Sequence, residues 1–181
     1  MRPPPPLLRA RARSAPHAAA ADAAAAAARH RLCFPPVTSA GYRWYDQQKT
    51  SPQWPFGHGL SYSTFTYSNL AVVGTVTPTA SATVYATVCN TAGPAGAEVV
   101  QLYVGYPDAA NEPPKQLKGF QKVGLASDGG CGGVGFPIEA KDLWTWDVTL
   151  GWQLIPGTYQ IYVGSTSRDI RLTGTLTVSA Q

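Results

Sequence analysis

Residues 54–67 read Trp54-Pro-Phe-Gly-His-Gly-Leu-Ser-Tyr-Ser-Thr-Phe-Thr-Tyr67, and they mark the point where a β-domain begins. Pro55 fixes one φ angle, and the glycines on either side of His58 allow backbone angles that are closed to other residues. This composition predicts a shaped loop that displays Phe56 and His58. Serine, tyrosine, threonine and phenylalanine then alternate, as is typical of a strand. The stretch therefore predicts a hinge between a preceding segment and the β-domain.

The residues after this hinge predict short strands at regular spacing. Residues 82–88 show the clearest pattern, because alanine or valine alternates with threonine or tyrosine, as in a half-buried strand. The expected strands cover residues 65–73, 82–88, 98–105, 117–123, 134–138, 144–148, 158–163 and 168–178. About seven strands with turn residues between them predict an all-β chain that forms a β-sandwich over roughly residues 64–178.

The alternation within two of these strands predicts which side chains face the core. In the third strand we expect one face to carry Val100, Leu102 and Val104 and the other to carry Val99, Gln101 and Tyr103. In the last strand the inward side chains are expected to be Ile170, Leu172, Leu176 and Val178.

The chain has three cysteines, Cys33, Cys89 and Cys131, and their spacing matches no zinc-binding pattern. An odd number leaves at least one thiol free. We interpret the cysteines as small buried or incidental side chains. The segment 126–133 is rich in glycine and predicts a flexible loop.

Residues 1–40 differ in composition from the rest of the chain, with a proline run followed by alanines and arginines. This predicts a disordered or weakly helical tail, and an artefact of gene prediction is an alternative origin. Residues 1–32 carry six arginines and one aspartate, whereas residues 33–181 carry eight basic and nine acidic side chains. The folded part therefore has no basic footprint for nucleic acid. The sequence has no run of 18 apolar residues, so we expect no membrane span.

Several motifs in a fixed order resemble the C-terminal part of glycoside hydrolase family 3 β-glucosidases. The first two are Tyr42-Arg-Trp-Tyr-Asp46 and Trp54-Pro-Phe-Gly-His-Gly-Leu-Ser-Tyr62. The later ones are Ala97-Glu-Val-Val-Gln-Leu-Tyr-Val104, Gln116-Leu-Lys-Gly-Phe120, Lys141-Asp-Leu-Trp-Thr-Trp-Asp-Val148, Pro156-Gly-Thr-Tyr159 and Ser167-Arg-Asp-Ile-Arg-Leu172. The resemblance covers about residues 41–181.

The resemblance implies a domain organisation. Residues 41–63 correspond to a connector that leaves a catalytic domain, and residues 64–181 correspond to a fibronectin type III-like domain of immunoglobulin-like topology. The connector side chains expected to contact the missing catalytic domains are Tyr42, Trp44, Tyr45, Trp54, Phe56 and His58. Family members are generally secreted, so the resemblance implies an extracellular location, although no signal peptide is recognisable in this chain.

The family's catalytic nucleophile and acid/base belong to the two missing domains, so neither can be assigned to a residue of this chain. Among the local carboxylates, Asp142 and Asp147 are five positions apart, and in an extended segment they point to opposite faces. Asp169 is flanked by Arg168 and Arg171, which predicts a surface ion pair. We therefore expect no catalytic residue, no metal and no cofactor in this chain.

Two functions remain open from the sequence. In the first, the chain packs against and stabilises the catalytic domains of a β-glucosidase. Trp144, Trp146 and Val148 share a strand face, which predicts core or inter-domain packing, and His58 is then a loop residue. In the second, exposed aromatic side chains stack on sugars, and the chain is a free-standing module that binds plant or fungal cell-wall polysaccharide. The alternative role for His58, which is displayed between two glycines, is that of a sugar hydrogen-bond donor or a general acid/base.

Overall fold

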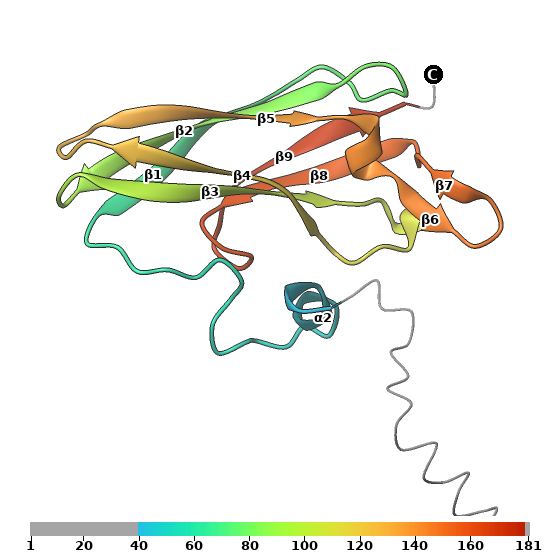
Figure 1. Ribbon diagram of the computed structural model, residues 1–181, viewed down its shortest axis with the longest axis horizontal. Coiled ribbons are helices and arrows are strands. Elements are labelled where there is room, and N and C mark those ends of the chain that lie inside the picture. Colours follow the sequence, from blue (N-terminus) through green and yellow to red (C-terminus); the bar gives the residue numbers. More distant parts are fainter. Residues whose placement is uncertain (1–39, 180–181) are drawn as a thin grey trace, which may run out of the picture. The chain divides into compact units, whose positions relative to one another are not determined.

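The computed structural model describes residues 40–179 (Figure 1). The predictions for the tail, and for Cys33, fall outside the described residues. The elements in chain order are α2 (Tyr42–Gln47), β1 (Thr64–Val73), β2 (Ala82–Ala92), β3 (Gly96–Gly105), η1 (Asp108–Ala110), β4 (Gln116–Leu125), β5 (Cys131–Ile138), η2 (Ala140–Leu143), β6 (Thr145–Asp147), β7 (Gly151–Gln153), β8 (Gly157–Gly164) and β9 (Ile170–Val178).

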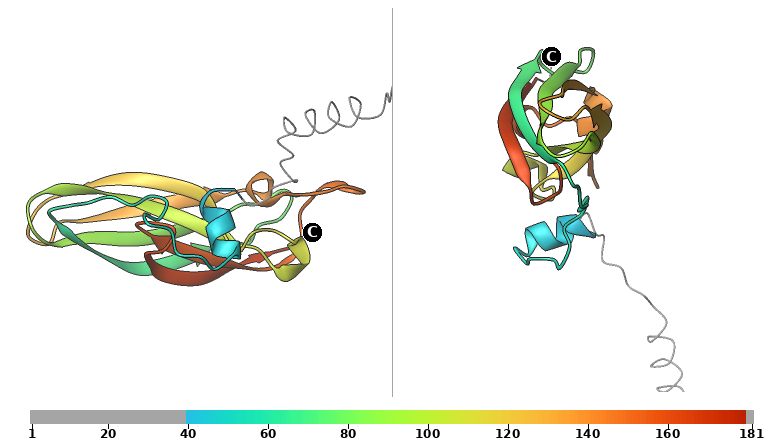
Figure 2. Two further views of the ribbon diagram at one scale, coloured as in Figure 1. Left: turned by 90° about the horizontal axis from the view of Figure 1, so that it is seen from below. Right: turned by 90° about the vertical axis from the view of Figure 1, so that its left-hand side faces the viewer.

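Seven of the strands form two antiparallel sheets that face one another (Figures 1 and 2). One sheet has the order β1-β2-β5, and the other has the order β4-β3-β8-β9. The two short strands β6 and β7 pair with each other in a separate hairpin between β5 and β8. The prediction of an all-β sandwich with about seven strands is confirmed.

The core lies between the two sheets and is built by the alternation seen in the sequence. One layer comes from the sheet β1-β2-β5 and includes the buried alanines and valines of β2. The opposite layer comes from β3, β8 and β9: Val100, Leu102, Val104, Ile161, Val163, Leu176 and Val178. Tyr159, at the start of β8, is also buried, and its hydroxyl donates a 2.7 Å hydrogen bond to the carbonyl oxygen of Ile155. Burial raises the pKa of Tyr159 to about 12. This tyrosine therefore fixes the corner through which the chain enters the late strands.

The structure corrects the interpretation of two cysteines. Cys89 of β2 and Cys131 of β5 lie directly opposite each other in the sheet and form a disulfide. Spacing in the sequence could not reveal this pair. The two cysteines are 42 residues apart, and they meet only because of the register between β2 and β5. The glycine-rich loop is also shorter than predicted, since Cys131 already belongs to β5.

The β6–β7 hairpin projects beyond the ends of the two sheets (Figure 1). The exposed fractions of Trp144, Trp146 and Trp152 are 47%, 60% and 62%, and Val148 at the tip is also exposed. The prediction that Trp144, Trp146 and Val148 pack in the core is therefore wrong, whereas the alternative of inter-domain packing stays a prediction. Trp146 lies opposite Trp152 in the hairpin, and Trp144 and Val148 lie just outside β6.

Candidate functional site

The connector lies against the outer face of the four-stranded sheet, on the side away from β1, β2 and β5 (Figures 1 and 2). The ring of Tyr42 in α2 stacks on Phe56, with centroids 4.9 Å apart, and meets Tyr103 of β3 edge-on at 5.8 Å. The hydroxyl oxygen of Tyr42 accepts a 2.7 Å hydrogen bond from the backbone N–H of Leu117. Tyr42 therefore anchors the connector to β3 and β4.

A buried carboxylate provides a second anchor. The side chain of Asp46 is only 4% exposed, and it pairs with Lys115 Nζ at 2.6 Å and with Arg168 Nε at 2.9 Å. Arg168 also donates a 2.9 Å hydrogen bond to the carbonyl oxygen of Thr50. A carboxylate withdrawn from water needs such partners, because burying an unpaired charge is costly. Asp46 and Arg168 thus hold α2 to the β8–β9 turn.

The loop that follows α2 is fixed by its close approach to β3. The backbone N–H of Ser167 donates a 2.9 Å hydrogen bond to the carbonyl oxygen of Phe56. Beneath the loop, Gln101 donates to the carbonyl oxygen of Ser165 and accepts a 2.5 Å hydrogen bond from the hydroxyl of Tyr103. Gln101 and Tyr103 are therefore buried although they lie on the sheet's outer face.

Gly57 is the position in this loop that tolerates a side chain least. Its φ angle is +84°, and a β-carbon there would overlap the side-chain amide of Gln101. We expect Gly57→Ala to destabilise docking of the connector by about 1–2 kcal/mol. Trypsin should then cleave after the exposed Lys49 about tenfold faster, because cleavage follows the population of the open form.

Gly59→Ala is the matched control for this prediction. A β-carbon at Gly59 would have no heavy atom within 4 Å, so its cleavage rate should equal that of the wild type. Equal rates for Gly57→Ala and the wild type would show that the loop is not held against Gln101.

Other aromatic side chains of this region remain exposed. We define the connector surface as Trp44, Tyr45, Trp54, Phe56 and Phe120, all of which are exposed. Trp44 and Tyr45 contact each other edge-on, and Trp54 lies 4.7 Å from the ring of His58. Phe56 and Phe120 line an apolar hollow of about 260 Å³ with Val99 and Leu117. Exposed apolar patches of this kind usually mark an interface.

The structure thus separates the six connector residues predicted from the sequence. Tyr42 and Phe56 stack on each other beside β3, although Phe56 stays about half exposed, and Trp44, Tyr45, Trp54 and His58 are exposed to solvent. Sequence reasoning missed Asp46, which lies inside the first quoted motif between an aromatic run and polar residues. The sequence feature that could have indicated Asp46 is its position as the one acidic residue at the end of an aromatic segment.

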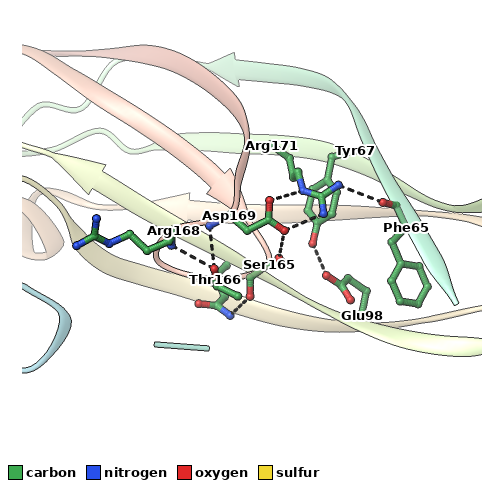
Figure 3. Close-up of polar contacts among 9 residues, drawn as sticks. Phe65, Tyr67, Glu98, Ser165, Thr166, Arg168, Asp169 and Arg171 are labelled. Atoms are coloured by element: carbon green, nitrogen blue, oxygen red, sulfur yellow. Dashed lines mark hydrogen bonds and ion pairs between the residues drawn. The ribbon is translucent and has the colours of Figure 1, made fainter. Parts of the chain in front are cut away.

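A polar network joins the two sheets next to the connector (Figure 3). The hydroxyl of Tyr67 in β1 donates a 2.6 Å hydrogen bond to Glu98 of β3. Arg171 of β9 binds both carboxylate oxygens of Asp169, at 2.6 and 2.7 Å, and Ser165 donates to the same carboxylate at 2.7 Å. The ion pair predicted for Asp169 is confirmed.

The electrostatics of this network favour a structural role. The hydrogen bonds from Arg171 hold the pKa of Asp169 below its ordinary value. Burial, followed by the hydrogen bond to Glu98, raises the pKa of Tyr67 well above its usual range. Asp169 is therefore a fully engaged carboxylate, and Tyr67 stays protonated, so neither group is poised to transfer a proton near neutral pH.

The two remaining candidate carboxylates cap turns. Asp142 Oδ2 accepts a 2.9 Å hydrogen bond from the backbone N–H of Glu139 at the start of η2. Asp147 Oδ1 accepts from the backbone N–H groups of Thr149 and Leu150, both at 2.8 Å, and these bonds lower the pKa of Asp147. Both residues therefore satisfy local backbone donors.

Within residues 40–179, no group of three or more histidine, cysteine, aspartate or glutamate side chains is arranged to hold a metal ion. No helix in that range is long and apolar enough to span a bilayer.

Residues 98–167 match the family model of the fibronectin type III-like domain. The chain is 44% identical over 164 residues to a probable β-glucosidase L from Aspergillus terreus, an alignment that covers 80% of this chain and 22% of the relative. The chain matches the C-terminal, fibronectin type III-like part of family 3 β-glucosidases.

The chain is also similar in structure to parts of solved β-glucosidases. A β-glucosidase from Chaetomella raphigera superposes with a TM-score of 0.73 at 41% identity, covering 81% of this chain and 23% of that one. A family 3 β-glucosidase from Bifidobacterium adolescentis gives a TM-score of 0.71 at 37% identity, covering 77% and 20% respectively. The chain therefore spans only about a fifth of the length of the relatives it matches.

Proposed function

We propose that the fibronectin type III-like domain packs against the catalytic domains of a β-glucosidase and stabilises them, and that the connector surface is its contact region. The observation that supports this most is the set of exposed aromatic side chains of the connector surface, on and near an α2 that Tyr42 and Asp46 hold to the sandwich. The connector precedes β1, so it is the segment through which the rest of a longer relative would join the sandwich. Tyrosine and tryptophan are the residues that most often anchor such interfaces.

The reaction of the whole enzyme is part of the same proposal. The relatives' names indicate hydrolysis of β-glucosides, and in this family the reaction would release a terminal β-D-glucosyl residue with retention. The carboxylates for that chemistry would come from the catalytic domains, and residues 41–63 and 64–181 would be the connector and the fibronectin type III-like domain. Secretion is also proposed, and the Cys89–Cys131 disulfide supports it because disulfides persist in oxidising compartments.

The proposal predicts that Trp44→Ser combined with Trp54→Ser lowers the surface hydrophobicity of the purified chain. A dye that fluoresces on apolar surfaces should lose roughly half of its signal, because both indoles belong to the connector surface. The separately produced catalytic domains of the Aspergillus terreus relative should quench the dye on the wild type and slow trypsin cleavage after Lys49.

Tyr85→Ser is the matched control, because Tyr85 is an exposed aromatic residue on β2, in the sheet that does not carry the connector. Its dye signal and its protection by the catalytic domains should match the wild type. Unchanged cleavage after addition of those domains would contradict the packing role.

A role in holding cell-wall polysaccharide is a second proposal. The exposed tryptophans on and beside the β6–β7 hairpin favour it, since aromatic faces can stack on sugars. Retention of the chain on insoluble cellulose or xylan would support this role, whereas a domain used only for packing should stay in the supernatant.

A further inference from the structure

A surface hollow of about 360 Å³ lies between the β1–β2 turn and the η2 segment. Its lining includes the residues Thr77, Thr79, Ser81, Glu139, Lys141 and Trp144. Ligand pockets in proteins usually measure about 300–1,000 Å³, so this one suits a small ligand. The hollow is separate from the connector surface, because the two share no lining residue.

The lining combines an aromatic face with polar groups that are already arranged in pairs. Trp144 is half exposed at the end of η2, so part of its indole is free for stacking. Lys141 Nζ lies 2.7 Å from Glu139 Oε2, and both side chains are more than half exposed. Each therefore keeps capacity for further hydrogen bonds, since an ammonium has three donors and a carboxylate accepts at about four sites.

The charge of the hollow selects among ligand classes. Because Glu139 and Lys141 neutralise each other, no net charge is available for a phosphate or for a free cation. A neutral ligand with many hydroxyl groups can instead bridge the ion pair, donating to the carboxylate and accepting from the ammonium. The β1–β2 turn contributes the hydroxyl-bearing residues Thr77, Thr79 and Ser81 to the same lining.

We propose that this hollow binds a neutral saccharide. One face of a sugar ring stacks on Trp144, and the hydroxyl groups of the ring bond to Glu139 and Lys141. The site does not depend on the packing role, and it would place the polysaccharide contact of the chain at a defined position. Trp146 and Trp152 do not line the hollow, and their rings meet at 74°, so they do not form a flat surface for a sugar chain.

The test is a titration of the full 181-residue chain with cellotriose, xylotriose and maltotriose, followed by the NMR signals of the tryptophan indole N–H groups. We expect saturable shifts of the Trp144 signal with at least one of these sugars. Trp144→Ala should weaken binding about tenfold or more, and Lys141→Ala should also weaken it. Trp152→Ala is the matched control, because it removes another exposed indole that lies outside the hollow, and its affinity should equal that of the wild type.

Two results would overturn the site: the absence of saturable shifts with all three sugars, or equal loss of binding in Trp152→Ala and Trp144→Ala. A thermal melt shows whether Trp144→Ala is folded. If it is not folded, the site is tested with two other variants: Trp144→Phe should retain sugar binding, and Lys141→Ala should weaken it. Failure here would leave the dye and protection experiments on the connector surface unaffected, so the two proposals can fail separately.

Discussion

Replacing Cys89 and Cys131 together by serine is expected to lower the free energy of unfolding by about 3–4 kcal/mol. The disulfide closes a loop of 42 residues between the neighbouring strands β2 and β5. A cross-link of this span restricts the unfolded chain, and its loss typically costs about 2–5 kcal/mol in a small domain. Because a domain of this size is stable by only about 5–15 kcal/mol, urea denaturation should show a clearly lower midpoint.

A reductant provides the control for this prediction. Reduced wild type should denature at nearly the same urea concentration as the double serine variant, and the reductant should leave the variant unchanged. Serine is close in size to cysteine, so little of the difference should come from packing. An unchanged urea midpoint in the double variant would contradict the prediction, because it would mean that the disulfide adds nothing to the stability that the hydrogen bonds between β2 and β5 and the core already provide.

The sequence predicted the sandwich well because its strands alternate between core and solvent. The pattern in β9 is an example: Leu176 and Val178 are buried while Thr177 between them is exposed. In β3 alternation assigned the two faces correctly, but it did not indicate that Gln101 and Tyr103 on the outer face are buried as well. The cause is the connector, which covers that face, and such a contact between distant segments leaves no periodic trace in either of them.

The candidate sites were less predictable than the fold. The connector aromatics could be listed, but which of them dock on the sheet depends on Asp46 reaching Lys115 and Arg168, residues far away in the chain. The hollow beside Trp144 likewise combines the β1–β2 turn with η2, which the fold alone brings together. The residue types in the sequence therefore indicated aromatic and charged contacts, but only the topology of the fold determines which of these residues lie next to each other.

The chain by itself is expected to hydrolyse aryl β-glucosides no faster than buffer does. A retaining glycosidase needs two carboxyl groups about 5–5.5 Å apart on either side of a bound sugar, one as nucleophile and one as acid/base. In residues 40–179 the candidate carboxylates are occupied in other ways. Asp46 is buried between two cations, Asp169 is held by Arg171, and Asp142 and Asp147 cap turns.

Binding a saccharide beside Trp144 would not change this expectation. Glu139 is paired with Lys141 and is exposed, and it is the one carboxylate among the residues that line that hollow. A single ionised carboxylate on an open surface cannot both protonate the leaving oxygen and attack the anomeric carbon. Sugar binding and sugar hydrolysis are therefore separable properties of this chain.

The measurement is an assay of the purified chain with an aryl β-glucoside, with the Aspergillus terreus relative as the positive control. Since glycosidases and other enzymes accelerate their reactions by at least about 10⁶-fold, the difference between the two proteins should be unmistakable. Turnover above the buffer rate that disappears in Asp142→Asn or Asp147→Asn would contradict the prediction and would place an active site in the η2–β7 region. Turnover that persists in both variants and through a further purification step would also contradict the prediction, whereas turnover that the purification removes belongs to a contaminating glycosidase.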